Sequence, residues 1–187
     1  PHSAGQSYTL TFPQSISADN FLKTDSSGNL SFAAAGGITE IDQWRLSANF
    51  TTQTGTLDSN WERVDTYGYD KLGTGLSQSS GIFSFPSTGH YLIMFNAYFD
   101  DTYAGNYIGV QMYYTQNNSS YNKVESNYTN SPTNGHHANV QIIHHLDITD
   151  TSNQKFKFQG NSHDSSRFSG STSTNNTNLV SIRLADT

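Results

Sequence analysis

The stretch Gly81–Asp101, "GIFSFPSTGHYLIMFNAYFDD", decides the fold that the sequence predicts. Its second half, from His90 to Phe99, is apolar at nearly every position, so a strand here would present two apolar faces. One face would carry Tyr91, Ile93, Phe95, Ala97 and Phe99, and the other Leu92, Met94 and Tyr98. A strand that is apolar on both faces has to be covered on both. We therefore expect the chain's own core on one face and a second cover on the other.

Shorter segments of the same kind precede and follow this stretch, separated by residues typical of turns. They are Ile41–Phe50, Trp61–Asp65, Asn106–Thr115, His137–Ile148, Gln154–Gly160 and Asn178–Asp186. The polar stretches between them are expected to be turns and loops, namely 51–60, 73–81, 116–135 and 161–176. The sequence shows no convincing long amphipathic helix. It predicts an all-β fold, an antiparallel two-sheet jelly-roll sandwich of about eight strands.

Residues 1–37 form a separate unit in this interpretation, a connector in front of a head formed by residues 38–187. Tyr8–Phe12 alternates apolar and polar residues and predicts a short strand. Phe21–Ala33, "FLKTDSSGNLSFA", predicts a β-hairpin around its central D-S-S-G. Such a hairpin cannot bury a core of its own. Ala33–Gly37 has the composition of a hinge.

Composition argues against several classes of function. The formal net charge of −6 offers no basic footprint for nucleic acid. No apolar run approaches the roughly 20 residues that span a bilayer, so membrane insertion is not expected. The absence of Cys excludes disulfides and thiolate metal sites. Hydrophobic residues make up only 33 %, but 11 Phe, 11 Tyr and 2 Trp favour ordered β-structure with long polar loops over disorder.

The central stretch resembles the C1q/tumour-necrosis-factor (TNF) type of jelly roll. That family shows the pattern G-x-F-x-x-P-x-x-G-x-Y-x-x-x-F, which is matched here by Gly81, Phe83, Pro86, Gly89, Tyr91 and Phe95. "HLDITDTSNQKFKFQG" and "NTNLVSIRLAD" follow in the family's order, so the resemblance covers roughly Gln43 to Asp186. It implies a homotrimer in which the second face of the apolar strand meets neighbouring chains. The trimer-interface residues in this interpretation are Leu92, Met94, Tyr98 and His145.

The segment "YTLTFPQSISADNFLKTDSSGNLSFA" resembles segments found just upstream of head domains in phage fibre and appendage proteins. The matching residues are Leu22, Thr24, Asp25, Gly28, Asn29 and Leu30. Together with the head, this resemblance implies a structural protein on the surface of a virion, a bacteriophage tail fibre or spike. Residues 1–37 would contact other virion proteins, and the trimeric head would attach to a host cell-surface glycan or protein. The alternatives are a bacterial C1q-like adhesin and a capsid or tail decoration protein with a purely architectural role.

Aromatic and Arg side chains in or beside the polar segments are the candidate receptor-binding residues. Such side chains are favoured in recognition, and aromatic faces suit sugar rings as well as protein surfaces. The candidates are Tyr103, Tyr107, Tyr121, Tyr128, Arg167 and Phe168. The alternative is that these rings pack beneath long loops or in the trimer interface.

Histidines and carboxylates are the candidates for a metal site. His144 and His145 are neighbours on a strand, so they point to opposite faces and cannot chelate one ion within a chain. We expect His144 in the core and His145 on the outward face, where a three-fold axis would bring three copies together. Asp100-Asp101 and Asp147/Asp150 offer the oxygen ligands that Ca²⁺ prefers, but "DITDTSN" is also typical of a tight turn. The prediction is no metal and no cofactor, with Ca²⁺ as the alternative.

Catalytic motifs are missing from the sequence. It contains no G-x-S-x-G elbow, no H-E-x-x-H and no phosphate-binding loop. A glycan hydrolase with paired carboxylates would need a longer groove than a chain of this size is expected to build. We therefore predict that the protein is not an enzyme.

Overall fold

The computed structural model describes residues 12–15, 20–34, 37–102, 106–130 and 136–187. The chain forms two compact units, Pro1–Gly37 and Ile38–Thr187. The regular elements of the described residues are all strands, and among these residues there is no helix of the length and apolarity needed to cross a membrane. The predicted strand at Tyr8–Phe12 falls almost entirely outside the described residues, so it stays a prediction. Of the predicted hinge at Ala33–Gly37, Ala33 and Ala34 belong to β2 instead, and residues 35–36 lie outside the described residues.

The N-terminal unit contains the predicted hairpin, formed by β1 (Asn20–Thr24) and β2 (Leu30–Ala34). Asp25 organises the turn, because its carboxylate accepts hydrogen bonds from the backbone N–H of Ser27 and of Asn29, each at 2.9 Å. The side-chain amide of Asn29 donates a further bond at 2.9 Å. This last bond and the backbone bonds hold the pKa of Asp25 below its ordinary value, since they favour the charged carboxylate.

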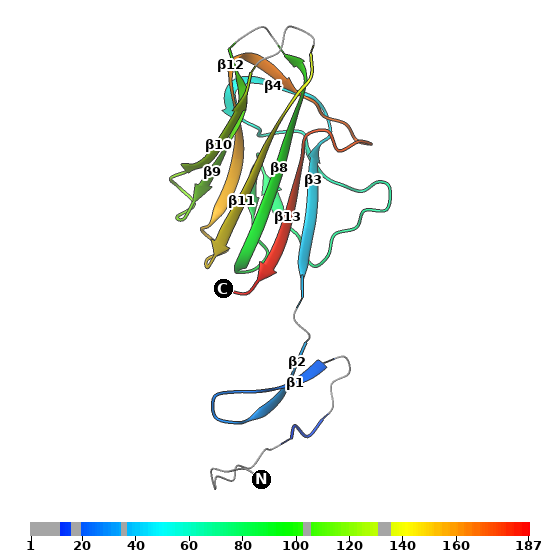
Figure 1. The fold of residues 1–187 in the computed structure, drawn as a ribbon, viewed down its shortest axis with the longest axis vertical. Helices are drawn as coiled ribbons and strands as arrows, with labels where there is room; N and C mark the ends of the chain where they lie inside the picture. The colour runs from blue at the N-terminus through cyan, green and yellow to red at the C-terminus, as the bar shows by residue number, and fades with distance from the viewer. Residues whose placement is uncertain (1–11, 16–19, 35–36, 103–105, 131–135) are drawn as a thin grey trace. The chain divides into compact units, whose positions relative to one another are not determined.

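The head is a sandwich of two antiparallel layers (Figure 1). The first layer has the order β11-β8-β13-β3-β5. The second has the order β10-β9-β12, with β4 and β7 also pairing with β12, and β6 pairing with β7. The first layer consists of β3 (Glu40–Leu46), β5 (Trp61–Arg63), β8 (Gly89–Thr102), β11 (Ala138–Ile148) and β13 (Asn178–Ala185). The second consists of β4 (Phe50–Thr56), β6 (Ser77–Ser79), β7 (Ile82–Ser84), β9 (Ile108–Thr115), β10 (Asn122–Thr129) and β12 (Lys155–Phe168). The layers join where the end of β12 pairs with the end of β8. The predicted all-β jelly-roll architecture is confirmed.

The core lies between the layers and is rich in aromatic rings. The face of β8 that was predicted to enter the core is fully buried, with Tyr91, Ile93, Phe95, Ala97 and Phe99 all at 0–1 % exposure. Phe95 stacks on Phe158 of β12 with the ring centroids 4.0 Å apart, which ties the two layers together. Aromatic pairs contribute about 0.5–1.5 kcal/mol beyond the area they bury. Such pairs help a chain of low aliphatic content to form a stable core.

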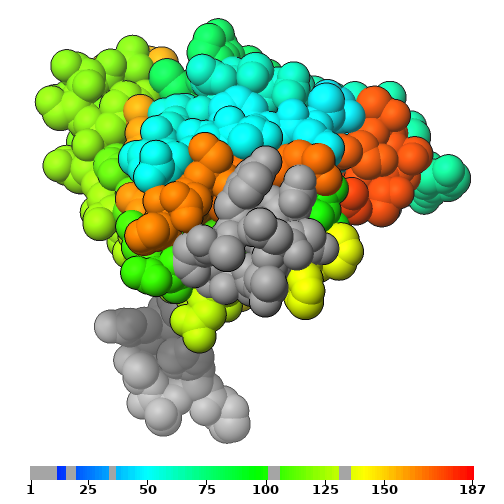
Figure 2. Space-filling view, turned by 90° about the horizontal axis from the view of Figure 1, so that it is seen from above, coloured from blue at the N-terminus to red at the C-terminus, as the bar shows by residue number. Residues whose placement is uncertain are grey.

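Several stretches predicted to be turns or loops form strands instead. Residues 50–56 form β4, residues 77–79 form β6, residues 122–129 form β10, and β12 continues through residues 161–168. Each has a partner that satisfies its backbone: β4 pairs with β12, β6 with β7, and β10 with β9. Figure 2 shows β4 (cyan) beside the second half of β12 (orange). Polar side chains are tolerated in these strands because one face of an antiparallel sheet can be solvated. The pairing of β4 with β12 joins distant segments, which a local pattern does not reveal, whereas β6 and β10 pair with adjacent strands and were missed because their residues are polar.

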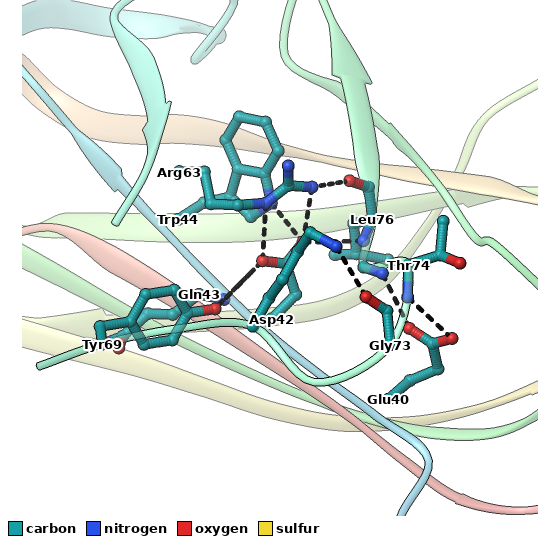
Figure 3. Close-up of polar contacts among 11 residues, drawn as sticks. Glu40, Asp42, Gln43, Trp44, Arg63, Tyr69, Gly73, Thr74 and Leu76 are labelled. Carbon is teal, nitrogen blue, oxygen red and sulfur yellow. Dashed lines mark hydrogen bonds and ion pairs between the residues drawn. The ribbon is translucent and has the colours of Figure 1, made fainter. Parts of the chain in front are cut away.

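A buried carboxylate, Asp42 of β3, fixes the long connection between β5 and β6 (Figure 3). It accepts hydrogen bonds from Arg63 Nε at 2.9 Å, from the Trp44 indole at 2.9 Å and from the Leu76 backbone at 2.7 Å. The Tyr69 hydroxyl donates to the same carboxylate at 3.1 Å. Burial, together with the nearby Asp42 charge, raises the pKa of Tyr69 far above its ordinary value. Both ends of this connection are therefore attached to β3.

Candidate functional site

The first candidate site is the face of the first layer that points away from the core, which we call the outer face. Residues paired across antiparallel strands point to the same side, so the register aligns side chains in rows across β11, β8 and β13. One row consists of Ile143, Met94 and Val180. The adjacent row consists of His145, Leu92 and Ile182, with Ile41 of β3 beyond. All of these side chains except His145 are apolar, so the two rows make a continuous strip, which we call the apolar strip, on a surface that the chain's own core does not use.

The apolar strip is open to solvent in the single chain. Ile143 is 61 % exposed, and Met94 and Val180 are half-buried. These side chains line a groove of about 210 Å³, together with amide side chains of the neighbouring row. A contiguous apolar surface of this kind marks a site of association more often than isolated exposed residues do.

Polar side chains border the strip on both sides. Gln141 and Asn96 occupy the next row in one direction, where the Gln141 amide donates to Asn96 at 3.4 Å. In the other direction, the next row contains His90 and Asp147, and the His90 ring stacks on His145 of the strip with the centroids 5.2 Å apart. Asp147 lies 4.0 Å from His90 Nδ1. An apolar centre with a polar rim is the usual anatomy of a protein–protein interface.

The four predicted interface residues all lie on the outer face, but they do not form one patch. Leu92, Met94 and His145 belong to the strip. Tyr98 lies beyond the polar Asn96 row, and its ring stacks on His137 at 5.6 Å. Contact between copies of the chain at these residues stays a prediction.

Sequence reasoning missed two members of the strip, Val180 and Ile182. The signal was present, because alternation along "NLVSIRLAD" puts both side chains on the same face of a strand. What the sequence did not provide was the neighbour: β13 pairs with β8 and so places these residues beside Met94 and Leu92.

The second candidate site is a pocket of about 210 Å³ lined by Tyr107, Tyr128 and Asn161, which we call the tyrosine pocket. Tyr107 immediately precedes β9, Tyr128 lies near the end of β10, and Asn161 lies in β12. The two tyrosine rings meet edge to face, with centroids 5.5 Å apart. His163 lies edge-on to Tyr107 at 6.2 Å. Tyr107 stays 38 % exposed and Tyr128 46 % exposed, so aromatic surface faces the solvent.

Neighbouring residues hold the Tyr128 ring in place. Tyr128 is paired with Gly109 of β9, and a Cβ at position 109 would lie only 2.2 Å from the Tyr128 ring. The ring therefore lies against bare backbone that only glycine provides. The Tyr128 hydroxyl accepts a hydrogen bond from Gln111 at 2.6 Å, and the Tyr113 hydroxyl donates to Gln111 at 2.9 Å. Because Gln111 is itself buried, the ring is held at both its face and its hydroxyl.

Among the predicted receptor-binding residues, the structure brings Tyr107 and Tyr128 together. Tyr121 lies just before β10, at the opposite end of that strand from Tyr128. Lys157 Nζ lies over the Tyr121 ring, 4.7 Å from its centroid, and burial raises the pKa of the Tyr121 phenol. Tyr121 therefore packs against a neighbouring side chain, and its role in receptor binding stays a prediction. Tyr103 lies outside the described residues.

Phe168 requires a correction, because it was predicted to lie in a polar loop and is instead 0 % exposed. It ends β12 and packs against Phe99 with ring centroids 4.4 Å apart. The polar residues before it hid the continuing alternation of β12. Its neighbour Arg167 lies on the opposite face of the strand and forms an ion pair with Asp100 at 2.7 Å.

The other candidate ligands have structural partners. Asp150 accepts hydrogen bonds from the backbone N–H of Ser152 at 2.9 Å and from the Asn153 side chain at 2.7 Å, as a tight turn requires. His144 is half-buried rather than in the core, and its Nδ1 lies 2.9 Å from Glu125 of β10. Within the described residues, no three His, Asp or Glu side chains are grouped so as to hold a metal ion. The alternative of a calcium site is not tested by this arrangement.

Comparison with protein-family models and with curated proteins gives no match for this sequence. Solved structures do show similarity. Eiger TNF from S. frugiperda superposes with a TM-score of 0.63 and 11 % identity, over 79 % of this chain and 93 % of that chain. Murine APRIL at pH 5.0 superposes with a TM-score of 0.58 and 14 % identity, over 78 % of this chain and 98 % of that chain. The PRD1 vertex protein P5 superposes with a TM-score of 0.52 and 15 % identity, over 81 % of this chain and 100 % of that chain.

At such low identity these similarities bear on the fold, because one fold serves many functions. The neighbours are TNF-family cytokines and a phage vertex protein, which are non-enzymatic kinds of protein. The absence of enzymatic activity in this chain stays a prediction. The order and pairing of the strands, together with these neighbours, show that the chain has a TNF-like jelly-roll fold.

Proposed function

We propose that this chain is a structural appendage protein of a virus particle. Its head assembles as a homotrimer through the outer face, and the assembled heads attach the particle to a host cell surface. The N-terminal unit serves as the connection to other virion proteins.

The observation that carries the proposal is the apolar strip on the outer face. The other face of β8 is already filled by the core, so the strip is not needed for the fold of one chain. Covering it removes apolar surface from water, which contributes about 25 cal/mol per Å² of apolar area. TNF-like folds are typically trimeric, which supports a second copy of the chain as the cover.

The virion part of the proposal has two supports. One is the similarity of the fold to the PRD1 vertex protein P5. The other is the resemblance of Leu22–Leu30 to segments that precede the heads of phage appendage proteins, together with the hairpin that this segment forms. Recovery of the chain from purified particles, detected by mass spectrometry of their proteins, tests this part. A chain found only on bacterial surfaces would favour the adhesin alternative.

Native mass spectrometry of the full chain at micromolar concentration tests assembly. We expect a mass three times that of the 20.6 kDa chain. Ile143→Glu places a charge in the strip and should give a monomer, because a buried unpaired charge is costly. Val124→Glu is the matched control, since Val124 is also an exposed aliphatic residue but lies on β10 in the other layer.

Three outcomes decide the trimer. A trimer that is lost in Ile143→Glu and kept in Val124→Glu supports the outer face as the interface. A wild-type monomer contradicts assembly altogether. A trimer that survives Ile143→Glu places the interface elsewhere and overturns the role of the strip.

Attachment is tested with the full chain on host cells by flow cytometry of the fluorescently labelled protein. Saturable binding to the host supports attachment. A protein that is present in particles but binds no host cell supports the architectural alternative instead.

A further inference from the structure

We propose that the tyrosine pocket binds one uncharged sugar ring of a glycan. This inference deepens the proposed function, in that it names the chemistry of the host receptor, and its trimer-dependent part rests on that proposal. The binding step at each pocket needs only the single chain.

The first argument is the chemistry of the lining. Tyr107 and Tyr128 supply aromatic faces, and Asn161 supplies an amide that can both donate and accept hydrogen bonds. The C–H groups of a sugar ring carry partial positive charge and are attracted to the negative face of an aromatic ring. The hydroxyl groups of the sugar would pair with the amide and with phenol oxygens. None of the three lining side chains is charged at neutral pH, so an uncharged sugar is the matching class.

The second argument is size. Sites for drug-sized ligands occupy about 300–1,000 Å³. The tyrosine pocket has about 210 Å³, which favours a single ring over a peptide or a long apolar chain.

The third argument is preorganisation. The Tyr128 ring is fixed by Gly109 beneath it and by Gln111 at its hydroxyl, as described above. On the other side, the backbone N–H of His163 donates to the Tyr107 carbonyl at 2.9 Å. Gln53 of β4 in turn donates to the His163 carbonyl at 2.7 Å. A rigid aromatic site loses little conformational entropy when a ligand binds.

The pocket is small, so each sugar contact should be weak. Three pockets on one trimer would act together, since linked binding sites can raise overall avidity by about 10²–10⁴-fold. Weak single sites are therefore compatible with firm attachment to a surface that displays many copies of a glycan.

Saturation-transfer-difference NMR with the full chain tests the pocket itself. The probes are the methyl glycosides of glucose, galactose and N-acetylglucosamine at millimolar concentration, with N-acetylneuraminic acid as the charged comparison. We expect transfer to at least one uncharged glycoside. Tyr107→Ala should weaken that binding by about tenfold, because it removes one aromatic face. Tyr107→Phe should keep it within about twofold, since the ring remains.

Tyr67→Ala is the matched control, because Tyr67 is an exposed tyrosine that does not line this pocket. Amide spectra of every variant report whether the head is folded. No transfer to any of the uncharged probes, or equal transfer to Tyr107→Ala and wild type, overturns the pocket. Transfer to the charged sugar alone overturns the uncharged class. If the protein is a monomer and binds sugar, the pocket proposal stands and the trimer proposal is wrong. If it is a trimer and binds no sugar, the trimer proposal stands and the pocket proposal is wrong.

Discussion

At the scale of single residues, buried charges attach the connection that follows β5 to β3. Asp42 joins β3 to Arg63 and to the connection that follows β5. Arg45, also fully buried, pairs with Glu62 at 2.7 Å and with Asp65 at 3.0 Å. A buried ion pair contributes little net stability compared with an apolar pair, but removing one partner leaves a costly unpaired group. These residues therefore specify one arrangement of the loops at the β3 side of the sandwich.

Replacing the central carboxylate tests this role. Asp42→Ala removes the acceptor for the Arg63, Trp44 and Leu76 donors at once. We expect the free energy of unfolding to fall by about 3 kcal/mol, measured by urea denaturation. Asp58→Ala is the control, because Asp58 is exposed, and it should change stability by less than about 0.5 kcal/mol. An Asp42 variant as stable as wild type would contradict the structural role.

At the scale of elements, β12 joins the two layers and also contributes a residue to the tyrosine pocket. Its first half pairs with β9 and β7, and its second half pairs with β4 and meets the end of β8. Its inward residues run from Phe156 to Phe168, while Asn161 lines the tyrosine pocket. The turn that leads from β11 into β12 depends on Asp150. The hydrogen bond from the Asn153 side chain, together with the backbone bonds, holds the pKa of Asp150 below the ordinary 3.8.

The depressed pKa of Asp150 sets the direction of a pH effect. Because the folded turn favours the charged carboxylate, its contribution is present above pH 3.8 and is lost as the pH falls through the lower, folded-state pKa. NMR titration should show the Ser152 and Asn153 amides changing with a midpoint below 3.8, and Asp150→Asn should remove that transition. A midpoint at or above 3.8 would contradict the hydrogen bonding of the turn.

Alternation predicted much of the secondary structure at this scale, but not all of it. It identified β8, the core face of that strand, and the hairpin of β1 and β2, because apolar periodicity and turn residues are local signals. It failed for β4, β10 and the second half of β12. Their side chains are mostly polar, so apolar alternation does not mark them. The strand β4 and the second half of β12 pair with each other across a long stretch of sequence, whereas β10 pairs with β9, the strand just before it.

At the scale of the whole molecule, the head has one apolar surface inside and another outside. The inner surface is buried within a single chain. The outer one, the apolar strip, is not covered in the single chain. If copies cover it, folding and assembly are coupled, and stability depends on protein concentration.

This coupling predicts a concentration-dependent Tm. Differential scanning calorimetry from micromolar to submillimolar chain should show the Tm of the wild type rising with concentration. The Tm of Ile143→Glu should stay constant over the same range, because its strip no longer associates. A wild-type Tm that is independent of concentration would indicate that the outer face contributes nothing to stability.

The sequence by itself determined the all-β class, the two-faced strand at its centre, the hairpin in front of the head, and which side of His90–Phe99 enters the core. All of these follow from the order of apolar, polar and turn residues within a few positions of one another. Only the tertiary structure decided that Val180 and Ile182 lie beside Met94 and Leu92, that Tyr107 and Tyr128 share a pocket with Asn161, and that Phe168 is buried. Those outcomes depend on which strands pair and in what register, and pairing is set by packing between segments far apart in the chain.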